Sequence, residues 1–388
     1  MSVLDSIDLM IISNRFKNDP NSYAVQIIGL GFFIQQICMD IGIFLQQSIM
    51  VRVSSLIGEG RRDEACQLTV DIYRISVLIN TFSTIIITLI ARLIMIFAGC
   101  TPDLIEQCML LVISLIAGLP FSTLFHIGTG FLQAIGKAVM NGILHLIANC
   151  LQTFAITPFL QYVIKVYVTL SNISQPIGQS TIGLIVFIMI FHGKYSLKPS
   201  FKMIINKGIN YGLPMIPTAL FAFSPATLIL GFMTSAAASE KWRTDIVAVF
   251  TILSEIFQVS IALPRALSTG FLTAAAHPMA QNSIKRMLVT LGYHSLFLLC
   301  FHSFDNYKVS VFMNLFGVAN ESHLEMAKKM IPIPFYAFPV GGISIFLVNF
   351  FIAIGKPLYS NLTSFIQLIS ICVGSKTLSL RFLDDPLK

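Results

Sequence analysis

Two distant segments of this 388-residue chain, residues 94–142 and 313–361, align without a gap at an offset of 219. The tetrapeptide Ala-Ile-Gly-Lys stands at 134–137 and again at 353–356. Further matched pairs in the same register are Phe97 with Phe316, Glu106 with Glu325, Pro120 with Pro339 and Phe131 with Phe350. A repeat of this length restricts the fold to two homologous halves that contain equivalent elements.

The composition is that of a membrane protein. Hydrophobic residues make up 55% of the chain and charged residues only 11%, against about 25% charged in ordinary soluble domains. Charge-free runs cover 107–136, 138–164, 166–193, 208–239, 330–355 and 357–375. Each run is near or above the roughly 18 to 20 residues that cross hydrocarbon as a helix. We therefore expect a multi-pass integral membrane protein, in the plasma membrane, without a cleavable signal peptide.

The predicted fold is an all-α bundle of about eleven membrane helices. After a partial helix at 2–13, the expected helices are 24–50, 72–98, 105–134, 140–165, 176–192, 209–235, 245–270, 286–304, 326–353 and 358–376. Six crossings lie within the 219-residue offset, so both copies insert in the same direction, as a parallel repeat. The predicted units are an N-terminal bundle (1–192), a cytoplasmic loop (193–208) and a C-terminal bundle (209–388).

Lys and Arg in the short loops predict the orientation, because basic residues resist translocation. The side that carries Arg61 and Lys198 has more of them and is expected in the cytoplasm. Two glycosylation sequons, at Asn172 and Asn320, fall in loops on the opposite side. Both asparagines are therefore expected to be accessible from outside the cytoplasm.

Several classes of protein are excluded or disfavoured. The seven cysteines are scattered through apolar spans, without a CxxC pair or a His/Cys cluster of metal-ligand spacing. The net charge of +7 is spread over short loops rather than one face, so nucleic-acid binding is not expected. No Ser/His/Asp array and no ATP-binding GxxxxGK[ST] motif is present. We expect no enzyme activity, no metal site and no cofactor.

Several motifs in order along the chain resemble one known family. They are Ile7-Asp8, the turn from Gly58 to Ala65, Leu119-Pro120-Phe121 leading to Gly136, Gly212-Leu-Pro214 and the second Ala-Ile-Gly-Lys. Their order and spacing look like the multidrug and toxic compound extrusion (MATE) family. The resemblance implies a secondary antiporter that exports organic cations or other amphipathic compounds in exchange for protons or sodium ions.

The chain departs from the family pattern in two respects. A family member has twelve helices, whereas here the first helix is expected to be incomplete and the twelfth to be missing. Either a clipped gene model or a non-functional paralogue would account for these short ends. In addition, the family's fifth helix often carries an Asn followed four residues later by an Asp. Asn149 matches the first position, but Thr153 occupies the second.

The predicted ion-coupling residues are Asp8, Asn149 and Asp40. Asp8 matches the acid that the resemblance implies for cation coupling in the first bundle, and a carboxylate in hydrocarbon is costly unless it has a function or a partner. Asp40 follows Gln36 by four residues, so both lie on one helix face. The alternative reading is that Asp8 reaches water near a helix end and that Asp40 is a buried structural partner.

The predicted substrate-binding residues are Gln36 and Glu255, which the 219-residue offset places at equivalent positions. Glu255 is alternatively a structural hydrogen-bonding group between helices. Pro120 and Pro339 are equivalent as well, and each removes a backbone hydrogen bond inside an apolar helix. They are therefore expected to bend their helices.

The sequence thus predicts an antiporter that works by alternating access, driven by a proton or sodium gradient, with small organic cations or amphipathic compounds as cargo. A monomer in the lipid bilayer is expected. Two alternatives stay open: a lipid-linked oligosaccharide flippase of the same superfamily, for which we expect a more cationic cavity, and an inactive structural membrane paralogue.

Overall fold

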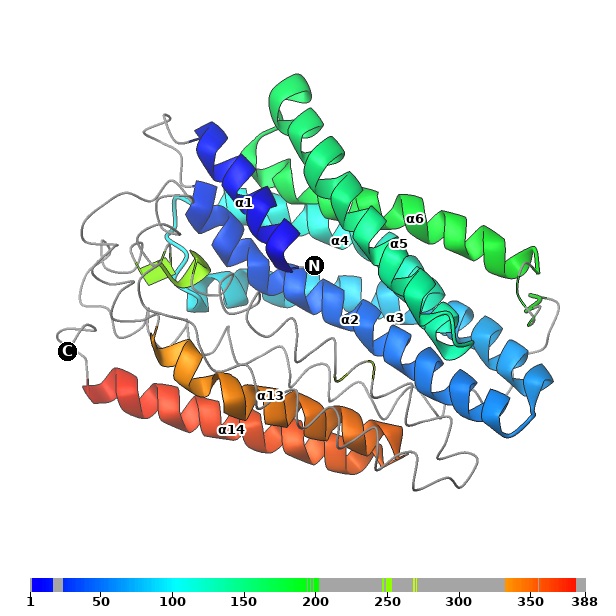
Figure 1. Cartoon of the computed structure of the whole chain (residues 1–388). Coiled ribbons are helices and arrows are strands. Elements are labelled where there is room, and N and C mark those ends of the chain that lie inside the picture. The colour runs from blue at the N-terminus through cyan, green and yellow to red at the C-terminus, as the bar shows by residue number, and fades with distance from the viewer. Residues whose placement is uncertain are drawn as a thin grey trace.

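The computed structural model describes residues 2–16, 24–193, 195, 197, 199–201, 246–247, 249–252, 268, 270, 332–354 and 356–381. Every regular element within these residues is a helix, which confirms the all-α prediction. Figure 1 shows α1 to α6 gathered in one bundle, with α13 (Pro332–Ala353) and α14 (Pro357–Arg381) side by side along it.

The helices of the first half are long. They are α1 (Ser2–Phe16), α2 (Ala24–Gly58), α3 (Arg62–Phe97), α4 (Ile105–Ala134), α5 (Ala138–Leu151) and α6 (Ser174–Phe191). Two π-helical segments, η1 (Gln152–Ile156) and η2 (Phe159–Ile164), continue α5, and the 3-10 helix η3 (Val168–Ile173) leads into α6. Five helical stretches of the described chain are long and apolar enough to cross a bilayer, and so the protein is a multi-pass membrane protein.

The predicted and observed helix boundaries agree best for helices that are apolar over their whole length. The range 105–134 was predicted for α4 and is observed. By contrast, α2 continues to Gly58 and α3 begins at Arg62, beyond the predicted 24–50 and 72–98. The reason is that hydropathy marks the part of a helix in hydrocarbon, whereas these helices continue into water. The predicted helices 209–235 and 286–304 lie outside the described residues, and 245–270 is described only in part.

The repeat is visible in the turn that each copy contains. Helix α4 ends at Ala134 and α13 at Ala353, and the next helices begin at Ala138 and Pro357, each pair 219 residues apart. Matched backbone bonds run from Ile135 N–H to Phe131 O and from Ile354 N–H to Phe350 O, both 3.1 Å. The two copies therefore end one helix and start the next in the same way. The full division at 193–208 stays a prediction.

Glycines let α2 and α4 approach closely. A Cβ at Gly130 of α4 would lie 2.7 Å from the backbone oxygen of Gln46, and one at Gly42 of α2 would overlap the His126 ring. Small residues are typical where membrane helices meet, because dispersion contacts there replace a hydrophobic driving force. The α2–α4 pair, which has the most extensive contact among the described elements, forms the centre of the first half.

The start of the predicted inter-bundle loop packs on the first half. Leu197 is buried, and the ring of Phe201 stacks on that of Phe191 in α6, with centroids 4.7 Å apart. Arg74 of α3 donates a hydrogen bond to the Phe201 carbonyl oxygen at 2.5 Å. Arg74 also lies 3.5 Å from the buried carboxylate of Asp71. These contacts attach the chain to α3 and α6 as far as residue 201.

The two halves meet in more than one place. Gly29 of α2 lies so close to Thr251 that an added Cβ would overlap the threonine side chain. Elsewhere Phe346 and Ile352 of α13 belong to the same buried apolar cluster as Phe44 of α2. Close packing near Gly29 and the apolar cluster that includes Phe44 thus join the first half to the described parts of the second.

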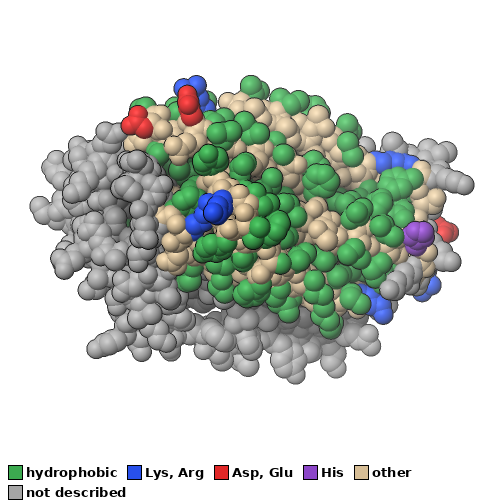
Figure 2. All heavy atoms as spheres, turned by 90° about the horizontal axis from the view of Figure 1, so that it is seen from above, with side chains coloured by type: hydrophobic (Ala, Val, Ile, Leu, Met, Phe, Trp, Pro, Cys, Tyr) green, Lys and Arg blue, Asp and Glu red, His purple; other side chains and the backbone are tan. Residues whose placement is uncertain are grey.

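The outer surface suits a lipid environment. Figure 2 shows apolar side chains over much of the described surface on one face, with few charged groups. Helix α3 is especially exposed, since Leu89 and Leu93 keep 72% and 68% of their side-chain surface. Exposed apolar surface of this extent on a helix of 36 residues fits contact with lipid tails.

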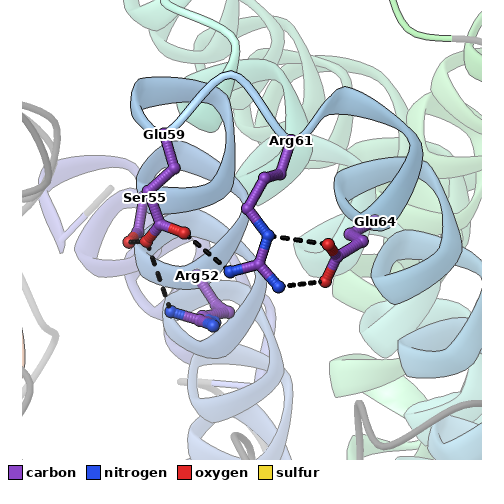
Figure 3. Close-up of polar contacts among 5 residues, drawn as sticks. All are labelled: Arg52, Ser55, Glu59, Arg61 and Glu64. Atoms are coloured by element: carbon purple, nitrogen blue, oxygen red, sulfur yellow. Dashed lines mark hydrogen bonds and ion pairs between the residues drawn. The ribbon is translucent and has the colours of Figure 1, made fainter.

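The turn between α2 and α3 holds a cluster of charges, shown in Figure 3. Arg61 donates to both carboxylate oxygens of Glu64, at 2.6 and 2.5 Å, and to Glu59 at 2.8 Å. The Arg61 hydrogen bond lowers the pKa of Glu59. Gly60 turns the chain at φ +80°, a conformation that favours glycine. Because the cluster is exposed, it shapes the turn and adds little stability.

The α2–α4 contact can be tested by substitution. Gly130→Val would force a side chain against the Gln46 backbone, and overpacking of this kind costs roughly 1 to 3 kcal/mol. We expect a lower melting temperature for the purified protein in detergent. Gly142→Val in α5 is the control, because a Cβ there meets nothing within 4 Å. Equal melting temperatures for the two variants would contradict the close packing.

Candidate functional site

A buried carboxylate lies where α1 meets α5. Asp8 is 6% exposed, and the side-chain nitrogen of Gln152 donates a hydrogen bond to its Oδ2. Asn149, also buried, lies one turn before Gln152 on the same helix. Next to them the Thr153 hydroxyl is 3.4 Å from the backbone oxygen of Leu4. The site thus combines one acid with amides and a hydroxyl from the facing helix.

The winding of α5 keeps its polar residues facing inward. Asn149, Thr153, Thr157 and Gln161 follow one another at intervals of four, and all four are buried. In a regular α-helix of 3.6 residues per turn, twelve residues would end about a third of a turn away from the starting face. The π segments at 152–156 and 159–164 have wider turns and reduce this drift.

Pro158 stands between the two π segments. Proline has no N–H to donate, so one α-helical hydrogen bond is missing at this position. Lys165 then ends the helix in the left-handed conformation, at φ 60°. This combination gives a local reason for the irregular winding beside the site.

A second polar group fixes the C-terminal end of α1. The Arg15 guanidinium donates to the side-chain oxygen of Gln161 at 2.7 Å and to the backbone oxygen of Val166 at 2.8 Å. Gln161 in turn donates to the hydroxyl of Ser171 at 2.9 Å. Helix α1 continues past the predicted 2–13 to Phe16, and Arg15 in its last turn holds α1 against the end of α5.

A third polar group joins α2 to the start of α6. Gln35 donates to Gln175 at 2.5 Å and accepts from the Asn172 amide at 3.1 Å. Asn172 is buried, so the prediction of an accessible glycosylation acceptor is wrong at this position. The physical reason is that its side-chain nitrogen, the atom that would carry the sugar, is used inside the protein. Asn320 lies outside the described residues.

Further polar pairs cross the interior between α2, α3, α4 and α6. They are Asn80 with Thr123 at 2.8 Å, Ser122 with Gln179 at 2.6 Å and His126 with Gln46 at 3.2 Å. Each pair joins two different helices. Because such bonds have no competing water in a membrane interior, they fix the relative positions of the helices.

The other predicted site residues are described only in part. Gln36 and Asp40 lie on α2, but their side chains are outside the described part of the structure, as is the whole of Glu255. Pro120 lies inside α4 and Pro339 inside α13, and both helices continue through them. The predicted bends stay predictions. Among the described residues, no group of three or more His, Cys, Asp or Glu side chains could hold a metal ion.

Gln152 was missed at the sequence level. The family pattern pairs Asn149 with the position four residues later, where Thr153 stands in place of an acid. The signal that could have identified Gln152 is the row of polar residues at 149, 152, 153, 157 and 161 within an otherwise apolar span. Such a row requires a protein-facing side of the helix.

The described helices thus form a multi-pass membrane bundle with a polar interior and a buried acid. Residues 7–159 match the MatE family model. The fold, moreover, is shared through almost the whole chain with solved MATE structures. Residues 7–159 are thus similar to the MatE family, and the fold of the chain is that of the solved MATE structures.

Three solved structures illustrate the similarity. A MATE protein in complex with MaL6 is 14% identical, with a TM-score of 0.73 over 98% of this chain and 93% of that one. An outward-facing multidrug resistance MATE family transporter of the MOP superfamily is 15% identical, with a TM-score of 0.74 over 99% and 87%. An inward-facing conformation described in the same terms is 13% identical, with a TM-score of 0.64 over 97% and 95%. A comparison with curated proteins gave no significant match.

The hydrogen bond between Gln152 and Asp8 leads to a stability prediction. Gln152→Leu removes a donor to a buried carboxylate, and a hydrogen bond to a charged group contributes about 1.5 to 3 kcal/mol. We expect the variant to unfold at a lower temperature than the parent in detergent. Gln107→Leu, at an exposed position of α4, is the matched control and should melt like the parent. An unchanged melting temperature for Gln152→Leu would show that the bond contributes nothing.

Proposed function

We propose that the protein is a secondary antiporter that exports small organic cations or amphipathic compounds in exchange for protons or sodium ions. The observation that carries the proposal is the carboxylate of Asp8, buried between two helices in a membrane bundle. An intramembrane acid is expensive and is retained chiefly where it binds an ion, a proton or a substrate.

The surroundings of Asp8 suit reversible binding. The neutral amide of Gln152 donates a hydrogen bond to it, and Asn149 and Thr153 add uncharged polar groups on the same helix. Oxygen ligands of this kind can coordinate a sodium ion, and a shielded carboxylate can also take up a proton. Asp71, the other buried carboxylate among the described residues, lies 3.5 Å from the guanidinium group of Arg74.

Coupling follows from differential affinity. An ion that binds one conformation of the site more tightly than the other shifts the population toward that conformation. If the cargo binds preferentially to the site once the ion has dissociated, an inward ion gradient drives outward export. Gln36 and Glu255 are the proposed cargo-binding residues in this scheme, and Asp40 is a further candidate for ion coupling.

The alternatives have less support. The family model and the matched structures are those of MATE proteins, so the lipid-linked oligosaccharide flippase is not favoured. A transport assay distinguishes the antiporter from an inactive paralogue, because a structural protein would not respond to an ion gradient.

Replacing Asp8 tests the coupling site directly. In proteoliposomes with an imposed proton or sodium gradient, Asp8→Asn should reduce ethidium export to the level of empty vesicles. Asp103→Asn removes an exposed carboxylate from the loop between α3 and α4 and should export like the parent. Comparing the two gradients identifies the ion. Export at the parental rate by a correctly inserted Asp8→Asn protein would place coupling elsewhere, with Asp40 next to test.

Glu255 is expected to act on the cargo rather than on the ion. Because its carboxylate would attract positive charge, Glu255→Gln should weaken the transport of cationic dyes several-fold and change that of neutral compounds little. The ratio of the two rates, measured on one batch of vesicles, is the readout. Equal losses for both kinds of cargo would exclude a role in charge selection.

A further inference from the structure

A groove opens between α3 and α4, near the loop that joins them. Its volume is about 260 Å³. The lining residues are Arg92, Ile105, Glu106, Met109, Leu110 and Ile113. Leu110 and Ile113 are more than half exposed and belong to the surface that faces lipid. The groove therefore opens toward the bilayer and is separate from the site around Asp8.

The groove holds one positive and one negative side chain that do not pair with each other. Arg92 and Glu106 both line it, and both are exposed. No ion pair joins them within the described part of the chain, where the ion pairs involve Arg52, Glu59, Arg61, Glu64, Asp71 and Arg74. Two opposite charges beside an apolar wall thus remain available to a ligand with both signs of charge.

Arg92 and Glu106 lie at different depths relative to the membrane surface. Arg92 lies five residues before the end of α3 at Phe97, which is about 7.5 Å along a helix that rises 1.5 Å per residue. Glu106 is the second residue of α4, close to the same membrane surface. Measured from the bilayer centre, the backbone of Arg92 therefore comes first and that of Glu106 lies nearer to water.

A zwitterionic phospholipid has its charges in the same order. Its phosphate lies next to the glycerol, and its ammonium group lies further out. A guanidinium group matches phosphate geometry with paired hydrogen bonds, and a carboxylate attracts the ammonium. The apolar wall at Met109, Leu110 and Ile113 would then contact the start of an acyl chain.

We propose that the groove between α3 and α4 binds a zwitterionic phospholipid, with Arg92 on the phosphate and Glu106 on the ammonium group. The bound lipid completes the apolar surface at this end of the helix pair. The proposal does not depend on the transport mechanism, since neither residue belongs to the site around Asp8.

The test is lipid binding to the full-length purified protein. Delipidated protein is titrated with phosphatidylethanolamine or, separately, with phosphatidylglycerol, and bound lipid is counted by native mass spectrometry. The parent should prefer phosphatidylethanolamine. Arg92→Gln should weaken the binding of both lipids roughly tenfold, as expected for a lost charge-assisted contact. Glu106→Gln should abolish the preference, because only the ammonium group distinguishes the two headgroups by charge.

The control is Arg62→Gln, at an exposed position at the start of α3 and away from the groove. It should bind both lipids like the parent. Circular dichroism checks that each variant keeps its helices. The proposal is overturned if the parent binds the two lipids equally, if Arg92→Gln and Arg62→Gln behave alike, or if Glu106→Gln keeps the parental preference.

Discussion

Inside a bilayer a polar side chain has no water to bind, so it needs a partner within the protein. The first half of this chain meets that requirement with bonds between helices. Gln152 binds Asp8 between α5 and α1, Asn80 binds Thr123 between α3 and α4, and Ser122 binds Gln179 between α4 and α6. Apolar surfaces alone would allow helices to slide or rotate. These pairs fix each helix in depth and in rotation, and the position of the acid depends on them.

The two buried carboxylates show how context decides the role of the same group. Asp71 lies next to Arg74, which also binds the carbonyl of Phe201, so this acid helps to attach the inter-bundle loop. Asp8 lies among amides and hydroxyls in the depth of the bundle. A charge compensated by a neighbouring cation has little need to exchange its partner. The role proposed for Asp8 requires instead that protons or ions exchange at its carboxylate.

Much of the fold was predictable because a run of apolar residues has the same length as the helix segment that crosses the hydrocarbon layer. The limits of α4 followed from its charge-free run, and the repeat correctly related the turn after Ala134 to the turn after Ala353. Asp8 and Asn149 were identified through the resemblance to family motifs, and the structure shows that both are buried. Gln152 was missed because the family pattern pairs Asn149 with the position four residues later, although the third residue after Asn149 lies on the same helix face. Asn172 fits a three-residue pattern that carries no information on burial, and Gln35 on another helix determines its state.

The glycine contacts between α2 and α4 have a mechanical consequence. Where Gly130 lies against the Gln46 backbone, no flexible side chain separates the two helices, and a close-packed contact is poorly compressible. The pair therefore behaves as the stiff part of the first half. Helices α1 and α5 meet instead through the side chains of Asp8 and Gln152. On the flank that carries Asp8, the spacing of the helices is therefore set by side-chain length, so that a shorter or longer side chain there would displace α1 without changing the α2–α4 contact.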